Sequence, residues 1–129
     1  MAIQFVVQLK NEPGSMAILA EELAARGVDL RAIGSGGLGD SGHVIMTTAD
    51  DETTKRVLNE GGYTYVEGES ILAEVDDKPG GMARIARQLV DSGVNIHGHL
   101  FLGRWGDRAM FAFVVDRPDL AKPILERKG

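Results

Sequence analysis

The stretch Asn11-Glu12-Pro13-Gly14-Ser15-Met16-Ala17 returns in the same chain as Asp77-Lys78-Pro79-Gly80-Gly81-Met82-Ala83. The two stretches lie 66 positions apart, as Pro13 and Pro79 show, and matches at this offset continue without a gap. The matching pairs are Ala20/Ala86, Leu23/Leu89, Gly27/Gly93, Val28/Val94, Gly37/Gly103 and Asp50/Asp116. Self-similarity at a fixed offset indicates repeated structural units. We therefore expect two copies of one small unit, at residues 1–68 and 69–129.

Hydrophobic periodicity predicts the elements of the first copy. Apolar residues alternate with other residues from Ile3 to Leu9, which is typical of a half-buried strand. Ser15 is placed to cap a helix, and Gly27 is placed to end it. Further strands are expected at Val28–Ile33, His43–Ala49 and Tyr63–Val66, with a helix that starts at Asp50 and stops near Gly61, and with a flexible loop at Gly34–Gly42. The predicted order is βαββαβ.

The second copy follows the same order but ends early. Strands are expected at Ile71–Val75, Val94–Leu102 and Arg108–Val115, and helices at Met82–Ser92 and from Pro118 onward, with Pro123 bending or interrupting the last one. No segment corresponds to the strand Tyr63–Val66. The fold class is therefore α+β: two ferredoxin-like βαββαβ units, the second lacking its last strand, with antiparallel sheets and helices on one face. An unpaired edge invites pairing, so we expect a homodimer.

Composition excludes several classes of function. The 129-residue chain has a net charge of −5 and no cysteine, which argues against a nucleic-acid partner, disulfides and zinc–cysteine sites. No apolar run approaches the roughly 20 residues that span a bilayer, and the start of the chain does not resemble a signal peptide. We expect a cytoplasmic protein without a membrane partner.

The repeated Pro-Gly turn is the strongest candidate site. Proline fixes φ in the turn, and glycine lets a ligand approach the backbone. The amide groups that follow begin a helix and favour a carboxylate, while Asn11 or Asp77 can accept from an ammonium group. A single such turn is more often only a structural turn. Two copies in register favour a ligand, and the charges suit an α-amino acid.

The first copy places the turn Asn11-Glu12-Pro13-Gly14 after a strand, and Gly27-Val28-Asp29-Leu30 after the helix that follows. In this pattern the chain resembles the ACT domain, a small amino-acid-sensing module. The second copy is similar to the serine-sensing module of phosphoglycerate dehydrogenases. The resemblance covers nearly the whole chain as a tandem pair. It implies that ligands bind between two units, where the turn of one faces the start of the second strand of the other.

The resemblance assigns two pockets. One pocket takes Asn11, Glu12, Pro13, Gly14 and Ser15, facing Asn95 and Ile96; the other takes Asp77, Lys78, Pro79, Gly80 and Gly81, facing Asp29 and Leu30. Two carboxylates meet in the second pocket, which favours a cation or raises one pKa, so the first is the better amino-acid site. Leu9 and Val75 stand where the serine-sensing modules carry a ligand-contacting histidine, so serine itself is not implied.

Other motifs favour binding over catalysis. Gly34–Gly39 spells G-x-G-x-x-G, but a strand follows where a nucleotide site needs a helix. His97 and His99 alternate on one strand, without a visible third metal ligand, and Trp105 is expected on a loop as an interface anchor. We expect no enzyme, cofactor or metal, but regulatory binding of a small amino acid, transmitted by oligomerisation or a partner protein. The alternatives are a ligand-free dimerisation module and, less favoured, a small enzyme using Asp29, Asp77 or His97.

Overall fold

The computed structural model describes residues 2–126, which divide into two compact units between Glu67 and Gly68. The elements of the first unit are β1 (Ile3–Lys10), α1 (Ser15–Ala25), β2 (Leu30–Leu38), β3 (Ser41–Thr48), α2 (Asp51–Glu60) and β4 (Tyr65–Glu69). Those of the second are β5 (Ile71–Asp76), α3 (Gly81–Asp91), β6 (Ile96–Trp105), β7 (Arg108–Val115) and α4 (Pro118–Leu125). Met1 and residues 127–129, the outer ends of the two expected units, lie outside the described residues.

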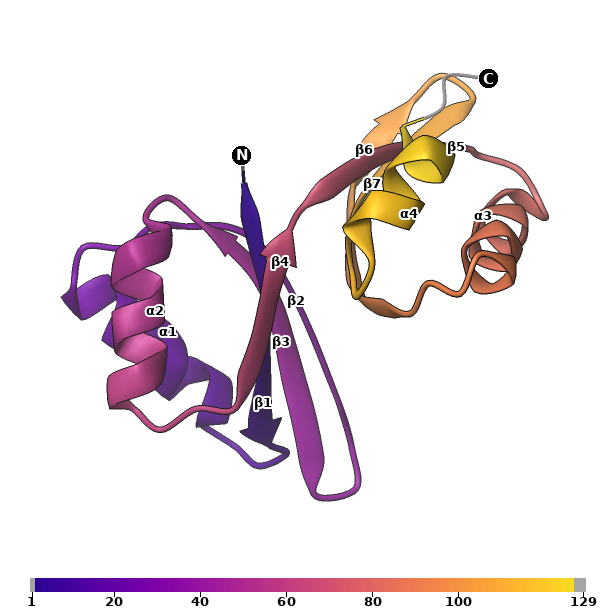
Figure 1. Cartoon of the computed structure of the whole chain (residues 1–129). Helices are drawn as coiled ribbons and strands as arrows, with labels where there is room; N and C mark the ends of the chain where they lie inside the picture. The colour runs from indigo at the N-terminus through magenta and orange to yellow at the C-terminus, as the bar shows by residue number, and fades with distance from the viewer. Residues whose placement is uncertain (1, 127–129) are drawn as a thin grey trace. The chain divides into compact units, whose positions relative to one another are not determined.

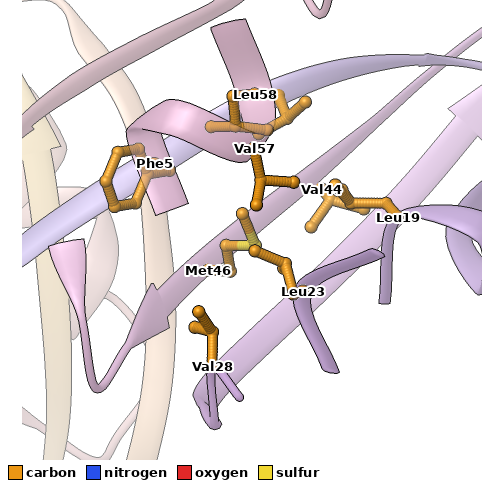
Figure 2. Packing of buried hydrophobic residues seen from close by; sticks show 9 residues of the cluster. Phe5, Leu19, Leu23, Val28, Val44, Met46, Val57 and Leu58 are labelled. Atoms are coloured by element: carbon orange, nitrogen blue, oxygen red, sulfur yellow. The ribbon is translucent and has the colours of Figure 1, made fainter. Parts of the chain in front are cut away.

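The first unit has a four-stranded sheet in the order β2-β3-β1-β4. β3 pairs antiparallel with both β1 and β2, and α1 and α2 lie side by side on one face of the sheet (Figure 1). Alternate residues of β1 and β3 bury against the helices because successive side chains of a strand point to opposite faces. The resulting core consists of Val7 and of the residues labelled in Figure 2: Phe5, Leu19, Leu23, Val28, Val44, Met46, Val57 and Leu58.

The second unit has a three-stranded sheet in the order β5-β7-β6, with α3 and α4 packed against it. Its core consists of Ile71, Ala73, Leu89, Val94, Phe113, Val115, Ala121 and Leu125. Among the described residues no fourth strand joins this sheet, and β5 forms one edge. The two ferredoxin-like units predicted from the sequence are confirmed. No helix within residues 2–126 combines the length and apolar composition needed to cross a bilayer.

The flexible loop predicted at Gly34–Gly42 is wrong. β2 continues to Leu38 and β3 starts at Ser41, so a tight hairpin turn at Gly39 and Asp40 replaces the loop. Pairing with β3 satisfies the backbone groups of the glycines, and Gly39 supplies the positive φ of 62° at the turn. The G-x-G-x-x-G motif therefore lies in a hairpin, with no helix to receive a phosphate.

The repeat offset of 66 positions does not hold beyond this hairpin. In the sheets, Met46 pairs with Phe5, and Phe113 pairs in the same way with Ile71. Met46 and Phe113 are therefore structurally equivalent, and they lie 67 positions apart in the sequence. The extra residue of the second copy is Leu102, where the pairing of β6 with β7 shifts register between Phe101 and Gly103. The match of Asp50 with Asp116 is therefore not a structural equivalence.

Three details of the helices also differ from expectation. Gly14 in a left-handed conformation is the N-cap of α1, so Ser15 is its first residue and not its cap. Gly80 does the same for α3. α4 continues through Pro123 to Leu125, so the proline does not interrupt it. Glycine succeeds at both caps because it reaches positive φ without a steric penalty.

Candidate functional site

The turn after β1 is fastened to the tip of the β2–β3 hairpin. The backbone N–H of Asn11 donates to the carbonyl of Asp40 at 3.0 Å, and its side-chain Nδ2 donates to the carbonyl of Gly39 at 2.9 Å. Gly14 then turns the chain into α1 with φ of 93°. Open space surrounds the position that a Cβ on Gly14 would take. The Pro-Gly turn is therefore held in place, while its glycine faces open space.

Asn11 lies against a glycine of the hairpin. A Cβ built on Gly37 would stand 2.4 Å from Oδ1 of Asn11, far inside van der Waals contact. The carboxamide therefore occupies the space that a side chain at position 37 would need. Asn11 thus has a structural role that sequence reasoning did not foresee: it fixes the hairpin with its amide nitrogen. Its Oδ1 is the atom that remains to accept from a ligand ammonium.

A hollow of about 250 Å³ opens between this turn and the hairpin. Its lining residues are Leu9, Lys10, Asn11, Glu12, Ser15, Met16, Ser35, Gly36, Gly37, Gly42, His43 and Val44. The hollow exists because three of these residues are glycines and two are serines. Ser15 and Met16 are the first residues of α1, and a helix N-terminus favours a carboxylate there.

The second turn is fastened to its hairpin in the same way but carries different chemistry. The backbone N–H of Asp77 donates to the carbonyl of Asp107 at 2.8 Å. The side chain of Asp77 pairs with Arg104, whose Nε lies 2.9 Å from Oδ2. The guanidinium of Arg104 also lies over the ring of Phe101, 4.7 Å from its centroid. Asp77 thus has a cationic partner from its own unit.

The hairpin of the second unit fills the place that is hollow in the first. By strand register, Phe101 corresponds to Ser35 and Phe111 to Val44, because these residues pair across the two hairpins. The rings of Phe101 and Phe111 pack with centroids 5.5 Å apart. Arg104 corresponds in the same way to Gly37. Gly37 lies against Asn11, whereas Arg104 pairs with Asp77. A small ligand has room at the first turn, whereas bulky side chains stand at the second.

The residues expected opposite the turns lie at the other end of each sheet. Leu30 pairs with Thr48, whereas the turn meets the Leu38–Ser41 end of the same hairpin. In the second unit, Asn95 and Asp116 bond reciprocally: Asn95 N–H donates to Oδ1 of Asp116 at 2.8 Å, and its carbonyl accepts from Asp116 N–H at 3.1 Å. Neither unit by itself brings Asp29 and Leu30, or Asn95 and Ile96, to its own turn.

An ion-pair cluster surrounds the second turn. Asp76 accepts from Arg84 at 3.0 Å and also pairs with Arg108. Lys78 of the predicted site lies 4.0 Å from the same carboxylate. The hydrogen bond from Arg84, with the charges of Arg108 and Lys78, holds the pKa of Asp76 below its usual value. Lys78 and Asp76 therefore belong to a local charge network.

The histidines do not form a metal site within the described residues. His97 and His99 are both exposed on β6, on either side of the buried Gly98, as their alternation predicted. The ring centroid of His99 lies 5.9 Å from that of Phe113. No group of three or more His, Asp or Glu side chains within residues 2–126 is placed to hold a metal ion. Trp105, expected on a loop, ends β6 and is 62% exposed.

Sequence reasoning missed Ser35, Val44, Arg104 and Phe111 as site-forming residues. It treated both hairpin tips as loops and aligned the copies at one constant offset. The signal available was the glycine content: five glycines in the first hairpin region against Phe101, Arg104 and Phe111 in the second. Alternation of side chains along paired strands would have placed these residues beside the turns.

Comparisons with solved structures identify the fold. A protein of Bacteroides thetaiotaomicron, BT0572, matches 97% of this chain and 86% of its own, with TM-score 0.70 and 19% identity. The ligand-free regulatory subunit of aspartate kinase from Thermus thermophilus matches 97% of this chain and 87% of its own, with TM-score 0.61 and 17% identity. The chain has the tandem ACT fold.

The same ACT fold also occurs within a longer enzyme. In the aspartate kinase of Clostridium acetobutylicum it covers 32% of the enzyme chain and 97% of the present one, with TM-score 0.60 and 14% identity. At these identities the likeness concerns the fold. No protein-family model matches the sequence, and no curated protein matches it.

Proposed function

We propose that this tandem ACT protein binds a small amino acid, or a related carboxylate, as a regulatory ligand at an interface between ACT units. The observation that carries the proposal is the open hollow at the first Pro-Gly turn. It adjoins the start of α1 and the carboxamide of Asn11, and it has a volume of about 250 Å³. A small zwitterion requires a partner for each of its two charges, and this turn offers both.

The ligand's carboxylate would lie at the first amides of α1, where the helix dipole favours negative charge. Its ammonium group would meet Oδ1 of Asn11, whose Nδ2 already donates to Gly39. Asn95 and Ile96 of a second ACT unit would complete the pocket, as the resemblance implies. The turn at Asp77 is the weaker site, because Arg104 already pairs with that carboxylate.

The output of binding would be a change in assembly or in the affinity for a partner protein. A ligand shifts such an equilibrium only through its differential affinity for the two states. The proteins of similar fold include a regulatory subunit and an allosteric enzyme. A regulated partner, recognised together with the ligand, is therefore part of the proposal, and chemical catalysis is not.

The experiment is an amino-acid screen followed by calorimetry. A ligand that binds the native state raises the melting temperature. Asn11→Ala should weaken binding by about tenfold to a hundredfold, since it removes a hydrogen bond to a charged group. Ser35→Phe should abolish binding by placing a ring where the second unit has Phe101. The control is Ser92→Ala, on an exposed residue that follows α3.

A ligand-free dimerisation module is the second candidate, and the second unit favours it. There the Asp77–Arg104 pair and the packed rings of Phe101 and Phe111 stand where the first unit has its hollow. If none of the twenty amino acids raises the melting temperature while the chain remains dimeric, this second function replaces the first. Unchanged affinity in both Asn11→Ala and Ser35→Phe would place the ligand elsewhere.

A further inference from the structure

A second and larger hollow of the first unit adjoins the same turn and shares Leu9, Lys10 and Ser15 with the smaller one. Its volume is about 580 Å³, within the range of roughly 300–1,000 Å³ typical of small-molecule sites. It opens between the end of β1, the first turn of α1 and the segment before β4. All of its lining residues belong to the first unit. The proposed function does not use it.

The floor of this hollow is apolar and fixed. Ile18 of α1 is 55% exposed toward solvent, a large fraction for an isoleucine on a helix that packs on a sheet. The ring of Tyr63 is held by two contacts: its hydroxyl donates to Glu22 at 3.1 Å, and Gly61 leaves room for the ring, since a Cβ there would stand 2.6 Å from it. Ile18 and Tyr63 therefore present apolar surface with room beside it.

Two opposite charges border the same hollow. Lys10 ends β1 and pairs across the strands with Ser41, the residue that follows Asp40. Both Lys10 and Asp40 line the hollow, and among residues 2–126 neither side chain has an ion-pair partner. An α-amino acid with an apolar side chain has a carboxylate, an ammonium group and an apolar part. Lys10, Asp40 and the apolar surface of Ile18 and Tyr63 offer one partner for each.

The second unit shows what this place looks like when it is closed. By register, Asp76 corresponds to Lys10, and Arg108 corresponds to Ser41. Arg84 corresponds to Ile18 at the repeat offset. Arg84 and Arg108 both pair with Asp76, and the remaining hollow is about 200 Å³. In the second unit the charged side chains at this place form ion pairs with one another. In the first unit Lys10 and Asp40 form no ion pair with each other, and Ile18 stands where the second unit has an arginine.

We propose that the larger hollow of the first unit binds an α-amino acid with a large apolar side chain. Lys10 contacts the carboxylate, Asp40 contacts the ammonium group, and the side chain lies on Ile18 and Tyr63. This inference rests on the amino-acid-binding function proposed above and gives it a second, neighbouring site. A small amino acid gains little here, because it does not reach the apolar floor.

The test uses L-leucine as the probe, with isocaproate and isoamylamine as analogues that each lack one charge. Leucine should bind at least about tenfold more tightly than either analogue, since each loses a charge-assisted contact. Lys10→Ala should weaken leucine binding by about tenfold, and Lys10→Arg should largely retain it. Arg87→Ala is the control: it removes one positive charge from an exposed residue of α3 in the second unit and should change nothing.

Ser35→Phe separates the two sites. It fills the smaller hollow and should leave leucine binding intact. If leucine affinity falls in Ser35→Phe, leucine occupies the smaller hollow, whose lining also includes Lys10, and this inference is wrong while the proposed function stands. Lys10-dependent leucine binding without any ligand sensitive to Ser35→Phe would support this site and contradict the proposed one. No detectable leucine binding to the unaltered protein also overturns the inference.

Discussion

The contact between Asn11 and Gly37 can be tested by a double-mutant cycle. A Cβ at position 37 would have three atoms of Asn11 as its nearest neighbours: Oδ1 at 2.4 Å, Cγ at 2.6 Å and Nδ2 at 3.0 Å. Gly37→Ala must therefore expel the carboxamide and break its bond to the carbonyl of Gly39. A lost hydrogen bond of this kind costs about 0.5–1.5 kcal/mol. We expect Gly37→Ala to lower the free energy of unfolding by about 1 kcal/mol.

The same substitution should behave differently after Asn11→Ala. All three clashing atoms are then absent, and φ at Gly37 is not positive. Alanine restricts the unfolded chain more than glycine does, which stabilises by about 0.4–1 kcal/mol at a compatible site. Gly37→Ala should therefore become neutral or stabilising in the Asn11→Ala background. The expected coupling energy between the two positions is about 1–2 kcal/mol.

Urea unfolding followed by far-UV circular dichroism measures the cycle. The single tryptophan, Trp105, lies in the second unit and reports it separately. Its transition serves as an internal control, because both substitutions are in the first unit. Equal costs of Gly37→Ala in the two backgrounds, within the roughly 0.5 kcal/mol expected of independent sites, would refute the contact and the role given to Asn11.

Three further predictions concern the second unit. Gly81→Ala would place a Cβ 2.1 Å from the carbonyl oxygen of Asp76, a backbone atom that cannot move aside easily. Unfolding measurements should therefore show a loss of about 3 kcal/mol in the free energy of unfolding. The corresponding change in the first unit, Ser15→Ala, should alter it by no more than about 0.5 kcal/mol. The hydrogen bond from Arg84 is the main cause that lowers the pKa of Asp76 in the folded protein. The ionised Asp76 therefore stabilises the fold at pH values above its ordinary pKa, and this stabilisation is lost as the pH falls through its lowered pKa in the folded state. Arg84→Ala should raise the Asp76 midpoint in a carboxyl NMR titration, and an unmoved midpoint would contradict this cause. Because the edge of β5 is open within the described residues, light scattering at micromolar concentration should give twice the 13.8 kDa chain mass; a monomer would exclude the homodimer.

Much of the fold follows from the sequence because its signals are local. The alternation that starts at Ile3 predicted β1, and Gly27, with φ of 74°, follows α1 where glycine was expected. The missing strand of the second unit was also visible, since no segment corresponds to Tyr65–Glu69. Each of these features depends on neighbouring residues, so periodicity and turn chemistry suffice to find it.

The hairpins could not be predicted in this way. Glycine is a poor strand residue, and its preference for loops is overridden here by pairing across the strands. Only the tertiary arrangement shows that Gly37 yields its space to Asn11. Only part of the candidate site could therefore be predicted. The Pro-Gly turn was predicted from its motif, whereas the hollow beside it also depends on Ser35 and Val44, which lie far from the turn in the sequence. How the turn meets a second unit stays a prediction.

The extra residue Leu102 has a consequence for how the two copies diverged. A one-residue shift in a strand would turn all its following side chains to the opposite face. The bulge instead absorbs the insertion locally, with Gly103 at φ of 153°, and the pairing of β6 with β7 resumes at Met110. The second copy can therefore carry Arg104 beside its Pro-Gly turn, where the first copy has Gly37, while its sheet stays paired. One extra residue in a strand thus lets two copies of one fold present different chemistry at the same turn.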